Sequence, residues 1–278
     1  MSKREFKLKQ ISYGGETVNV LLQSTNGPCG FLALVNALIL SRRLKQSESL
    51  IARFDNLVHE VANLLLDMNV MTSQPFDMDS ILSQLSRLDE GLILNPLFSD
   101  CQTFRNSNTE IFSLLKIPLF HGWVVDEGEA YAILKDKSFD SCQDILARLD
   151  DLTHLTRSSG STEDSHTLVD GPKIYSWLQA NQSQLTYAGL FQIHERLPDG
   201  EVGVLFRANH FSTIVKHNGS IYSLVTDESF GNLIEVVWER LDDTCGDTEY
   251  YPENFVRVFV NDMVSGSVSP KDCCCRIC

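Results

Sequence analysis

The sequence predicts an α+β fold built from a helical lobe and a β-sheet lobe. Three observations carry this prediction. An unbroken apolar run over 31–40 and helical spacing of apolar residues over 48–70 indicate helices. Two β-type runs, 202–215 and 221–227, flank an Asn-Gly dipeptide at 218–219, the strongest short-range hairpin signal. At 278 residues with 43% hydrophobic content, the chain can fill a sizeable core.

The other elements follow in chain order. We expect one domain over residues 1–261 and a flexible Cys-rich tail over 262–278. Within the domain, the patterns predict strands at 5–11 and 17–23, helices at 77–88 and 109–116, a turn into a strand at 119–126, a mobile surface loop at about 150–172, two helices within 173–197 with Trp177 in the core, and a last strand at 256–260.

Residues 23–30, Gln-Ser-Thr-Asn-Gly-Pro-Cys-Gly, precede the first apolar run and predict a cysteine nucleophile at a helix start. Asn26 or Gly27 can cap this helix, and Pro28 suits the first helical position because its missing N–H needs no partner there. Cys29 then lies in the first turn, where unpaired N–H groups and the helix dipole favour a thiolate. Free cysteines are usually buried and inert, so this interpretation needs a base.

Gln23 lies six residues before Cys29. Its side-chain amide can fold back over the intervening turn and donate a hydrogen bond to a developing oxyanion. The backbone N–H of Cys29 supplies a second donor. We therefore expect Gln23 to be an oxyanion-stabilising residue.

His210 is the favoured base among seven histidines. It interrupts the apolar run over 202–215, where polar residues would face a cleft. If the Asn-Gly dipeptide forms a two-residue loop, position 210 lies opposite Asp227, which would orient the imidazole. A shift of one residue would bring Thr226 opposite instead, so the third member stays open.

The order glutamine, cysteine and then histidine about 180 residues later is that of a papain-like cysteine hydrolase. We therefore expect a papain-like cysteine protease fold, with Cys29 on the helical lobe, His210 on the β-sheet lobe and a cleft between them. His121 is an alternative base, but it lacks the hairpin partner that His210 has.

Five sequence blocks resemble the signature blocks of the MINDY family of deubiquitinases, in the order of that family. They are Gln23–Cys29, Phe120–Asp126, Gln184–Leu190, Phe206–Thr213 and Leu224–Asp227. The resemblance spans roughly residues 18–260. One departure is Gly30, which stands where proline is common in the family; glycine loosens the turn but removes no chemical group.

The resemblance implies a papain-like thiol isopeptidase that trims polyubiquitin and prefers chains linked through lysine 48 of ubiquitin. It implies that Cys29 is the nucleophile, His210 the general base and Gln23 the oxyanion stabiliser. It assigns His121 to structure or to substrate contact, and it leaves the partner of His210 open.

The net charge of −14 argues against nucleic-acid binding, which needs clustered Lys and Arg. It suits ubiquitin, which has a basic rim around its apolar patch, although acidity can serve solubility alone. We expect no cofactor and no metal, because the cysteines before the tail lack paired ligand spacing and a Cys-x-x-Cys pair in the tail has no second pair. The isolated cysteines are Cys29, Cys101, Cys142 and Cys245.

No signal peptide or membrane span is evident, so we expect a cytoplasmic protein in a reducing compartment. The C-terminal residues leave membrane association open. Cys275 occupies the position that a prenyltransferase modifies, and Cys273 and Cys274 are available for palmitoylation. Arg276 and Cys278 depart from the usual prenylation pattern, so a tail of free thiols is the alternative.

Two other functions stay open on the sequence. The first is a ubiquitin-binding module whose catalysis is vestigial. The second is another cysteine acyl-transfer hydrolase, because the fold alone does not determine the substrate.

Overall fold

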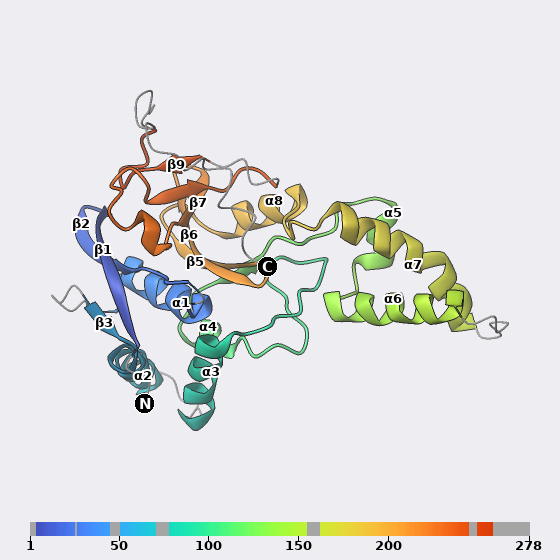
Figure 1. The fold of residues 1–278 in the computed structure, drawn as a ribbon, viewed down its shortest axis with the longest axis horizontal. Helices are drawn as coiled ribbons and strands as arrows, with labels where there is room; N and C mark the ends of the chain where they lie inside the picture. The colour runs from blue at the N-terminus through green and yellow to red at the C-terminus, as the bar shows by residue number, and fades with distance from the viewer. Residues whose placement is uncertain are drawn as a thin grey trace.

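The computed structural model describes residues 4–25, 27–44, 51–70, 78–154, 162–244 and 249–257. Helices and strands contribute to separate segments of the chain, so the α+β prediction is confirmed (Figure 1).

The first half of the chain starts with two strands and is then mainly helical. Its elements are β1 (Glu5–Tyr13), β2 (Glu16–Leu21), α1 (Cys29–Leu40), β3 (Ile51–Arg53), α2 (Phe54–Val70), α3 (Met78–Glu90), α4 (Glu110–Leu114) and β4 (Leu119–His121).

The second half places four helices before a run of strands. Its elements are α5 (Glu129–Leu134), α6 (Phe139–His154), α7 (Thr162–Ala180), α8 (Tyr187–Arg196), β5 (Val202–Arg207), β6 (His210–His217), β7 (Ser220–Leu224), the 3-10 helix η1 (Glu228–Phe230), β8 (Trp238–Arg240) and β9 (Tyr250–Tyr251).

The strands form two sheets. The smaller has the order β2-β1-β3 and is antiparallel. The larger has the order β4-β5-β6-β7-β8-β9; β4 runs parallel to β5, and the other neighbours are antiparallel. The larger sheet therefore joins a strand from the middle of the chain to the C-terminal strands.

Helix α1 lies at the centre of the main core. Every residue from Gly30 to Leu40 is buried, because a helix that is apolar on all sides has to be covered on all sides. It packs against β6, β5, β2 and α3. The buried Asn36 exchanges two hydrogen bonds with the backbone of Leu21, at 2.8 and 3.0 Å. These bonds fasten the end of β2 to α1, two residues before Gln23.

The predicted hairpin at 218–219 is confirmed, with His217 opposite Ser220. The run over 202–215, which we predicted as a single strand, is two strands joined by a tight turn at Ala208 and Asn209. Both turn residues have left-handed backbones, with φ of 49° and 60°. The polar interruption before His210 is therefore a turn, and His210 begins β6.

Other predicted boundaries need correction. The helix predicted over 48–70 starts only at Phe54, because residues 51–53 form β3 and pair with β1. The expected loop at 150–172 is wrong where it is described, since α6 continues to His154 and α7 starts at Thr162. At the expected last strand, residues 256 and 257 are irregular, and β8 and β9 are the C-terminal strands within the described chain.

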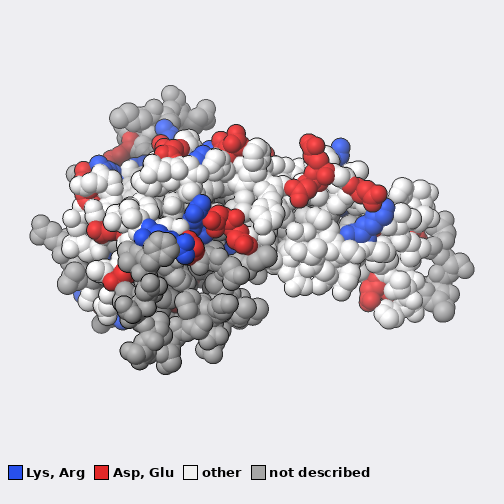
Figure 2. All heavy atoms as spheres, turned by 90° about the horizontal axis from the view of Figure 1, so that it is seen from above, with Lys and Arg blue, Asp and Glu red and all other residues white. Residues whose placement is uncertain are grey.

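Helices α5, α6 and α7 project from the body that holds the sheets (Figure 1). This arm has its own apolar core, in which the ring centroid of Phe98 lies 5.2 Å from that of Trp123 and 4.9 Å from that of Trp177. Trp177 is thus a packing residue, as predicted. Figure 2 shows Asp and Glu side chains on both the arm and the body, in keeping with the net charge of −14.

Cys245, the segment 258–261 and the tail over 262–278 lie outside the described residues, and with them the cysteines considered for lipidation. Along the segments that the structure describes, no helix combines the length and the apolar composition needed to cross a bilayer.

Candidate active site

Cys29 is the first residue of α1. Pro28 is the residue before the helix, at φ −76° and ψ 80°, and no side chain caps it. This corrects the expectation that Pro28 is the first helical residue behind a cap at Gly27; the other candidate cap, Asn26, lies outside the described residues. The position of Cys29 in the first turn agrees with the prediction.

The Cys29 thiol lies in the seam between α1 and β6. Burial raises its pKa, and backbone N–H groups of Phe211, Gly30 and Cys29 itself partly offset this effect by stabilising the thiolate. Two of these donors belong to the helix start, as expected, but burial outweighs them. The third belongs to β6. In the free protein the sulfur is therefore protonated at neutral pH and held against the strand that His210 begins.

His210 is the first residue of β6 and is partly exposed. Burial of its ring lowers the pKa, so the imidazole is neutral at pH 7. In the portion of the chain that is described, its ring makes no hydrogen bond. A neutral, unengaged imidazole can accept a proton.

Gln23 follows β2, and its backbone N–H, its backbone carbonyl and its side-chain amide each make a hydrogen bond. Its N–H donates to the carbonyl of Thr226 at 2.6 Å, and its own carbonyl accepts from the N–H of Glu228 at 3.1 Å. Its side-chain Nε2 donates to the carbonyl of Gly27 at 3.1 Å. The amide therefore folds back over the turn that leads to Cys29, as the sequence predicts. A primary amide has a second N–H, which leaves one donor for a ligand.

The third member of the site is not where the hairpin register predicts it. The ladder between β6 and β7 ends at the pair Ile214 and Ser223, before it reaches position 210. Asp227 instead forms a parallel bridge with Gln23, and its Oδ1 accepts from the N–H of Ser229 at 2.7 Å, which caps η1. Among the described residues, neither Asp227 nor Thr226 hydrogen-bonds to His210.

His121, the alternative base, is fully buried. Its Nδ1 accepts from the N–H of Trp123 at 3.3 Å, and its Nε2 donates to the carbonyl of Thr103 at 3.2 Å. Burial lowers its pKa to about 4. Both ring nitrogens thus have backbone partners, and the side chain is buried. His121 is structural.

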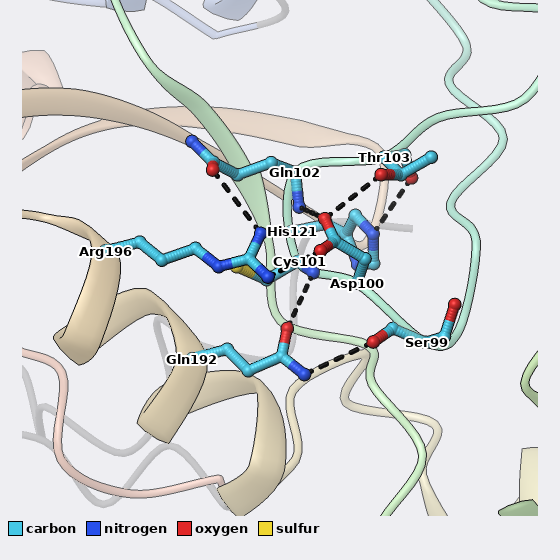
Figure 3. A network of polar contacts seen from close by, with 8 residues as sticks. All are labelled: Ser99, Asp100, Cys101, Gln102, Thr103, His121, Gln192 and Arg196. Carbon is cyan, nitrogen blue, oxygen red and sulfur yellow. Dashed lines mark hydrogen bonds and ion pairs between the residues drawn. The ribbon is translucent and has the colours of Figure 1, made fainter.

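The loop around His121 is fastened to α8 (Figure 3). Arg196 pairs with Asp100 at 2.5 Å, and Gln192 donates to the carbonyl of Ser99 and accepts from the N–H of Cys101. Asp100 also accepts from the N–H of Gln102 and the hydroxyl of Thr103. The side chains of Asp100, Gln192 and Arg196 in Figure 3 all have protein partners, as is typical of a structural network.

The other described cysteines are poor nucleophiles. Cys101 and Cys142 are fully buried, and burial raises the pKa of each thiol to about 12. Cys29 alone among these three is partly exposed. Exposure therefore selects the same cysteine that the sequence motif selects.

Sequence reasoning missed one group, the backbone N–H of Phe211 beside the Cys29 sulfur. A backbone donor has no residue-type signature, and it reaches the sulfur only because β6 packs against α1. No signal in the sequence identifies it.

The family model described as MINDY deubiquitinase matches residues 4–255. Similar proteins include the ubiquitin carboxyl-terminal hydrolases MIY1 of Saccharomyces cerevisiae, 33% identical over 92% of this chain and 73% of that protein, and MINDY-1 of Homo sapiens, 31% identical over 89% of this chain and 53% of that protein. MINDY-2 of Bos taurus is 30% identical over 90% of this chain and 40% of its own length. This chain thus spans about half the length of the human relative. Because the family match covers nearly all described residues, the chain belongs to the MINDY deubiquitinase family.

Proposed function

We propose that this chain is a cysteine-type deubiquitinase that hydrolyses isopeptide bonds in polyubiquitin. Family membership supports the substrate class, since the relatives are named ubiquitin carboxyl-terminal hydrolases. The observation that carries the chemistry is the position of the Cys29 thiol, at a helix start and against the N–H of Phe211, the residue after His210. A cysteine and a histidine on adjoining elements, here the start of α1 and the start of β6, suit covalent acyl transfer.

In the proposed reaction, His210 takes the thiol proton as the Cys29 sulfur attacks the isopeptide carbonyl at the C-terminal glycine of ubiquitin. The neutral state of both groups in the free protein fits this transfer. The N–H of Cys29 and the Nε2 of Gln23 donate to the oxyanion. His210 then returns the proton to the departing lysine amine, and water hydrolyses the thioester.

The proposed architecture is papain-like, with a helical lobe that bears the nucleophile, a sheet lobe that bears the histidine and a cleft between them. Its support is that Cys29 begins a helix while His210 begins a strand of the larger sheet. A narrow cleft would admit only the slender glycine-ended tail of ubiquitin. A preference for chains linked through lysine 48 is part of the proposal and follows from the resemblance alone.

Two observations favour the alternative of a ubiquitin-binding module with vestigial catalysis. The Cys29 pKa is raised, and no described residue orients the ring of His210. The intact Gln23, Cys29 and His210 favour the enzyme. The third possibility, another cysteine acyl-transfer hydrolase, differs from both in its substrate.

A ubiquitin probe with a C-terminal electrophile separates these functions. We expect an adduct on Cys29, mapped by mass spectrometry, and none on Cys142, which serves as an internal control in the same molecule. A binding module would hold the probe without a covalent bond. Di-, tri- and tetra-ubiquitin of each linkage, compared with short peptide substrates, then test the substrate class. Cleavage of peptides but not of ubiquitin chains would favour the other hydrolase.

We also propose that the tail holds the protein at membranes through lipids on Cys275 and on Cys273 or Cys274. Two lipid chains are needed for stable anchoring, which one chain does not provide. Mass spectrometry of the native C-terminal peptide tests this directly. A full-length peptide with only free thiols would end the idea.

A further inference from the structure

Lys9 on β1 is a buried charge with an unusual set of partners. Only 6% of the residue is exposed. Its Nζ donates to three backbone carbonyls, those of Phe230 at 3.0 Å, Leu233 at 2.7 Å and Val236 at 2.7 Å. An ammonium group has three N–H donors, so Lys9 uses all of them on one segment.

That segment, residues 230–236, runs from the end of η1 to the start of β8. One residue separates it from residues 226–228, whose backbone binds both the N–H and the carbonyl of Gln23. It also packs closely against Leu22, the residue before Gln23. A Cβ atom added at Gly231 would lie 2.9 Å from the Cδ1 of Leu22.

A buried ammonium is costly unless it is fully hydrogen-bonded. Burial lowers the pKa of Lys9, and the carboxylate of Glu235 partly opposes this effect. The observed path of residues 230–236 brings three carbonyls to one nitrogen. Charge-assisted bonds are about twice as strong as neutral ones, so Lys9 selects this path over others.

We propose that Lys9 is a positioning residue of the active site. By binding the carbonyls of residues 230–236, it holds residues 226–228 where they fix the backbone of Gln23. Gln23 in turn presents its amide beside the turn that leads to Cys29. The catalytic part of this inference rests on the proposed function; the positioning part does not.

Lys7 provides a matched control. It lies two residues earlier on β1 and reaches the same part of the chain, since its Nζ pairs with Glu228 at 3.0 Å. Its side chain is 72% exposed, so this ion pair contributes little. Lys7→Met and Lys9→Met change the charge equally and differ in the buried hydrogen bonds.

The first measurement is amide hydrogen exchange at Gln23 and Glu228, the two N–H groups that join these segments. We expect both to exchange at least about tenfold faster in Lys9→Met, because their partners are no longer held, and at the wild-type rate in Lys7→Met. Lys9→Arg, which keeps a cation with several donors, should restore part of the protection. If Lys9→Met does not fold, Lys9→Arg is compared with Lys7→Arg instead. We then expect a smaller increase in the exchange rates of the same two amides in Lys9→Arg. Unchanged exchange at both amides would overturn the proposal.

The second measurement is kinetic. We expect Lys9→Met to lower kcat by about 10–100-fold with little change in KM, because a misplaced donor affects the transition state more than substrate binding. In a Gln23→Ala background the same substitution should lower kcat by less than about twofold, because Lys9 acts through Gln23. An equal loss in both backgrounds would mean a merely structural role and would overturn the catalytic part. If the wild-type protein neither cleaves chains nor reacts with the probe, the proposed function fails, and hydrogen exchange still decides whether Lys9 positions Gln23.

Discussion

This protein has two cysteine–histidine regions whose histidines lie on the same sheet, His121 on β4 and His210 on β6, and the regions differ in whether their side chains already have partners. Cys101 and His121 are fully buried, the N–H of His121 binds the carbonyl of Cys101 at 2.7 Å, and both ring nitrogens of His121 have backbone partners. Cys29 and His210 are partly exposed, and the ring of His210 has no partner within the described chain.

The difference teaches that residue type is a weak guide to reactivity. Both cysteines have raised pKa values because both are buried to some extent. Only Cys29 has helix-start N–H groups beside its sulfur and an imidazole on the adjoining strand that can still accept a proton. A satisfied network stabilises the fold, whereas a catalytic site has to keep groups unsatisfied until substrate binds.

The largest expected effect comes from removing the Cys29 sulfur, and removal of the Cys101 sulfur is the comparison. Cys29→Ala should lower kcat by at least about 10⁴-fold and leave ubiquitin binding intact, because only the nucleophile is lost. Cys101→Ala should retain turnover. Chain-cleavage assays with purified variants, together with a binding titration, measure both. Residual cleavage by Cys29→Ala at near wild-type rate would remove the distinction between the two regions.

The next effect concerns Gln23, which has no counterpart near Cys101. Gln23→Ala should reduce kcat by about 10²–10³-fold, as expected for loss of one oxyanion donor. Gln192→Ala is the matched control, because it removes an amide that binds backbone groups beside Cys101. It should lower the melting temperature and leave kcat of the folded protein unchanged. Equal effects of the two variants on kcat would contradict the assignment.

The buried histidine predicts a pH dependence of stability. The pKa of His121 is lowered to about 4, whereas the unfolded imidazole protonates near its ordinary value of 6.5. Between these values the unfolded state binds the extra proton, so stability falls as the pH falls through this window. The contribution is about 3 kcal/mol and is fully lost below about pH 4.

Urea unfolding at a series of pH values tests this prediction. His121→Gln should be less stable at pH 7 and should lose most of this pH dependence. His210→Ala should keep it, which locates the effect at the structural histidine. A wild-type slope that survives in His121→Gln would point to other groups.

The smallest effect is the pH profile of thiol alkylation in the free protein. Because burial raises the Cys29 pKa, its reaction with iodoacetamide should still rise with pH beyond the point where that of free glutathione levels off. Cys101 and Cys142 should remain unmodified while the protein is folded. Peptide mapping after timed alkylation measures all three. A Cys29 profile that levels off near neutral pH would show that a thiolate already exists before substrate binds.

Local signals predicted the parts of the fold that depend on neighbouring residues. The placement of Cys29 in the first turn of a helix and the register of the hairpin at 218–219 follow from Pro28 and from the Asn-Gly dipeptide. The turn before His210 was missed because Ala208 adopts a left-handed backbone that alanine rarely favours. Its neighbour Asn209, a residue type that tolerates a left-handed backbone, is the one local signal of this turn.

Composition misled where packing decides the structure. The segment 150–172 is rich in Ser, Thr and Asp, which is typical of a loop, yet its described parts are helical. The helices α6 and α7 pack against each other, and Leu149 of α6 contacts Gly171 of α7. A Cβ atom added at Gly171 would lie 2.8 Å from the Cδ2 of Leu149. Tertiary contacts of this kind override a weak local preference.

The sequence by itself determined the residue types of the candidate site, their order and the placement of Cys29 in the first turn of a helix, because a proline and an apolar run act over a few residues. Tertiary structure alone decided the neighbours: the N–H of Phe211 at the sulfur, Asp227 beside Gln23 instead of His210, and the three carbonyls on Lys9. These contacts join segments far apart in the chain. Their geometry depends on how the whole core packs, which no short stretch of sequence encodes.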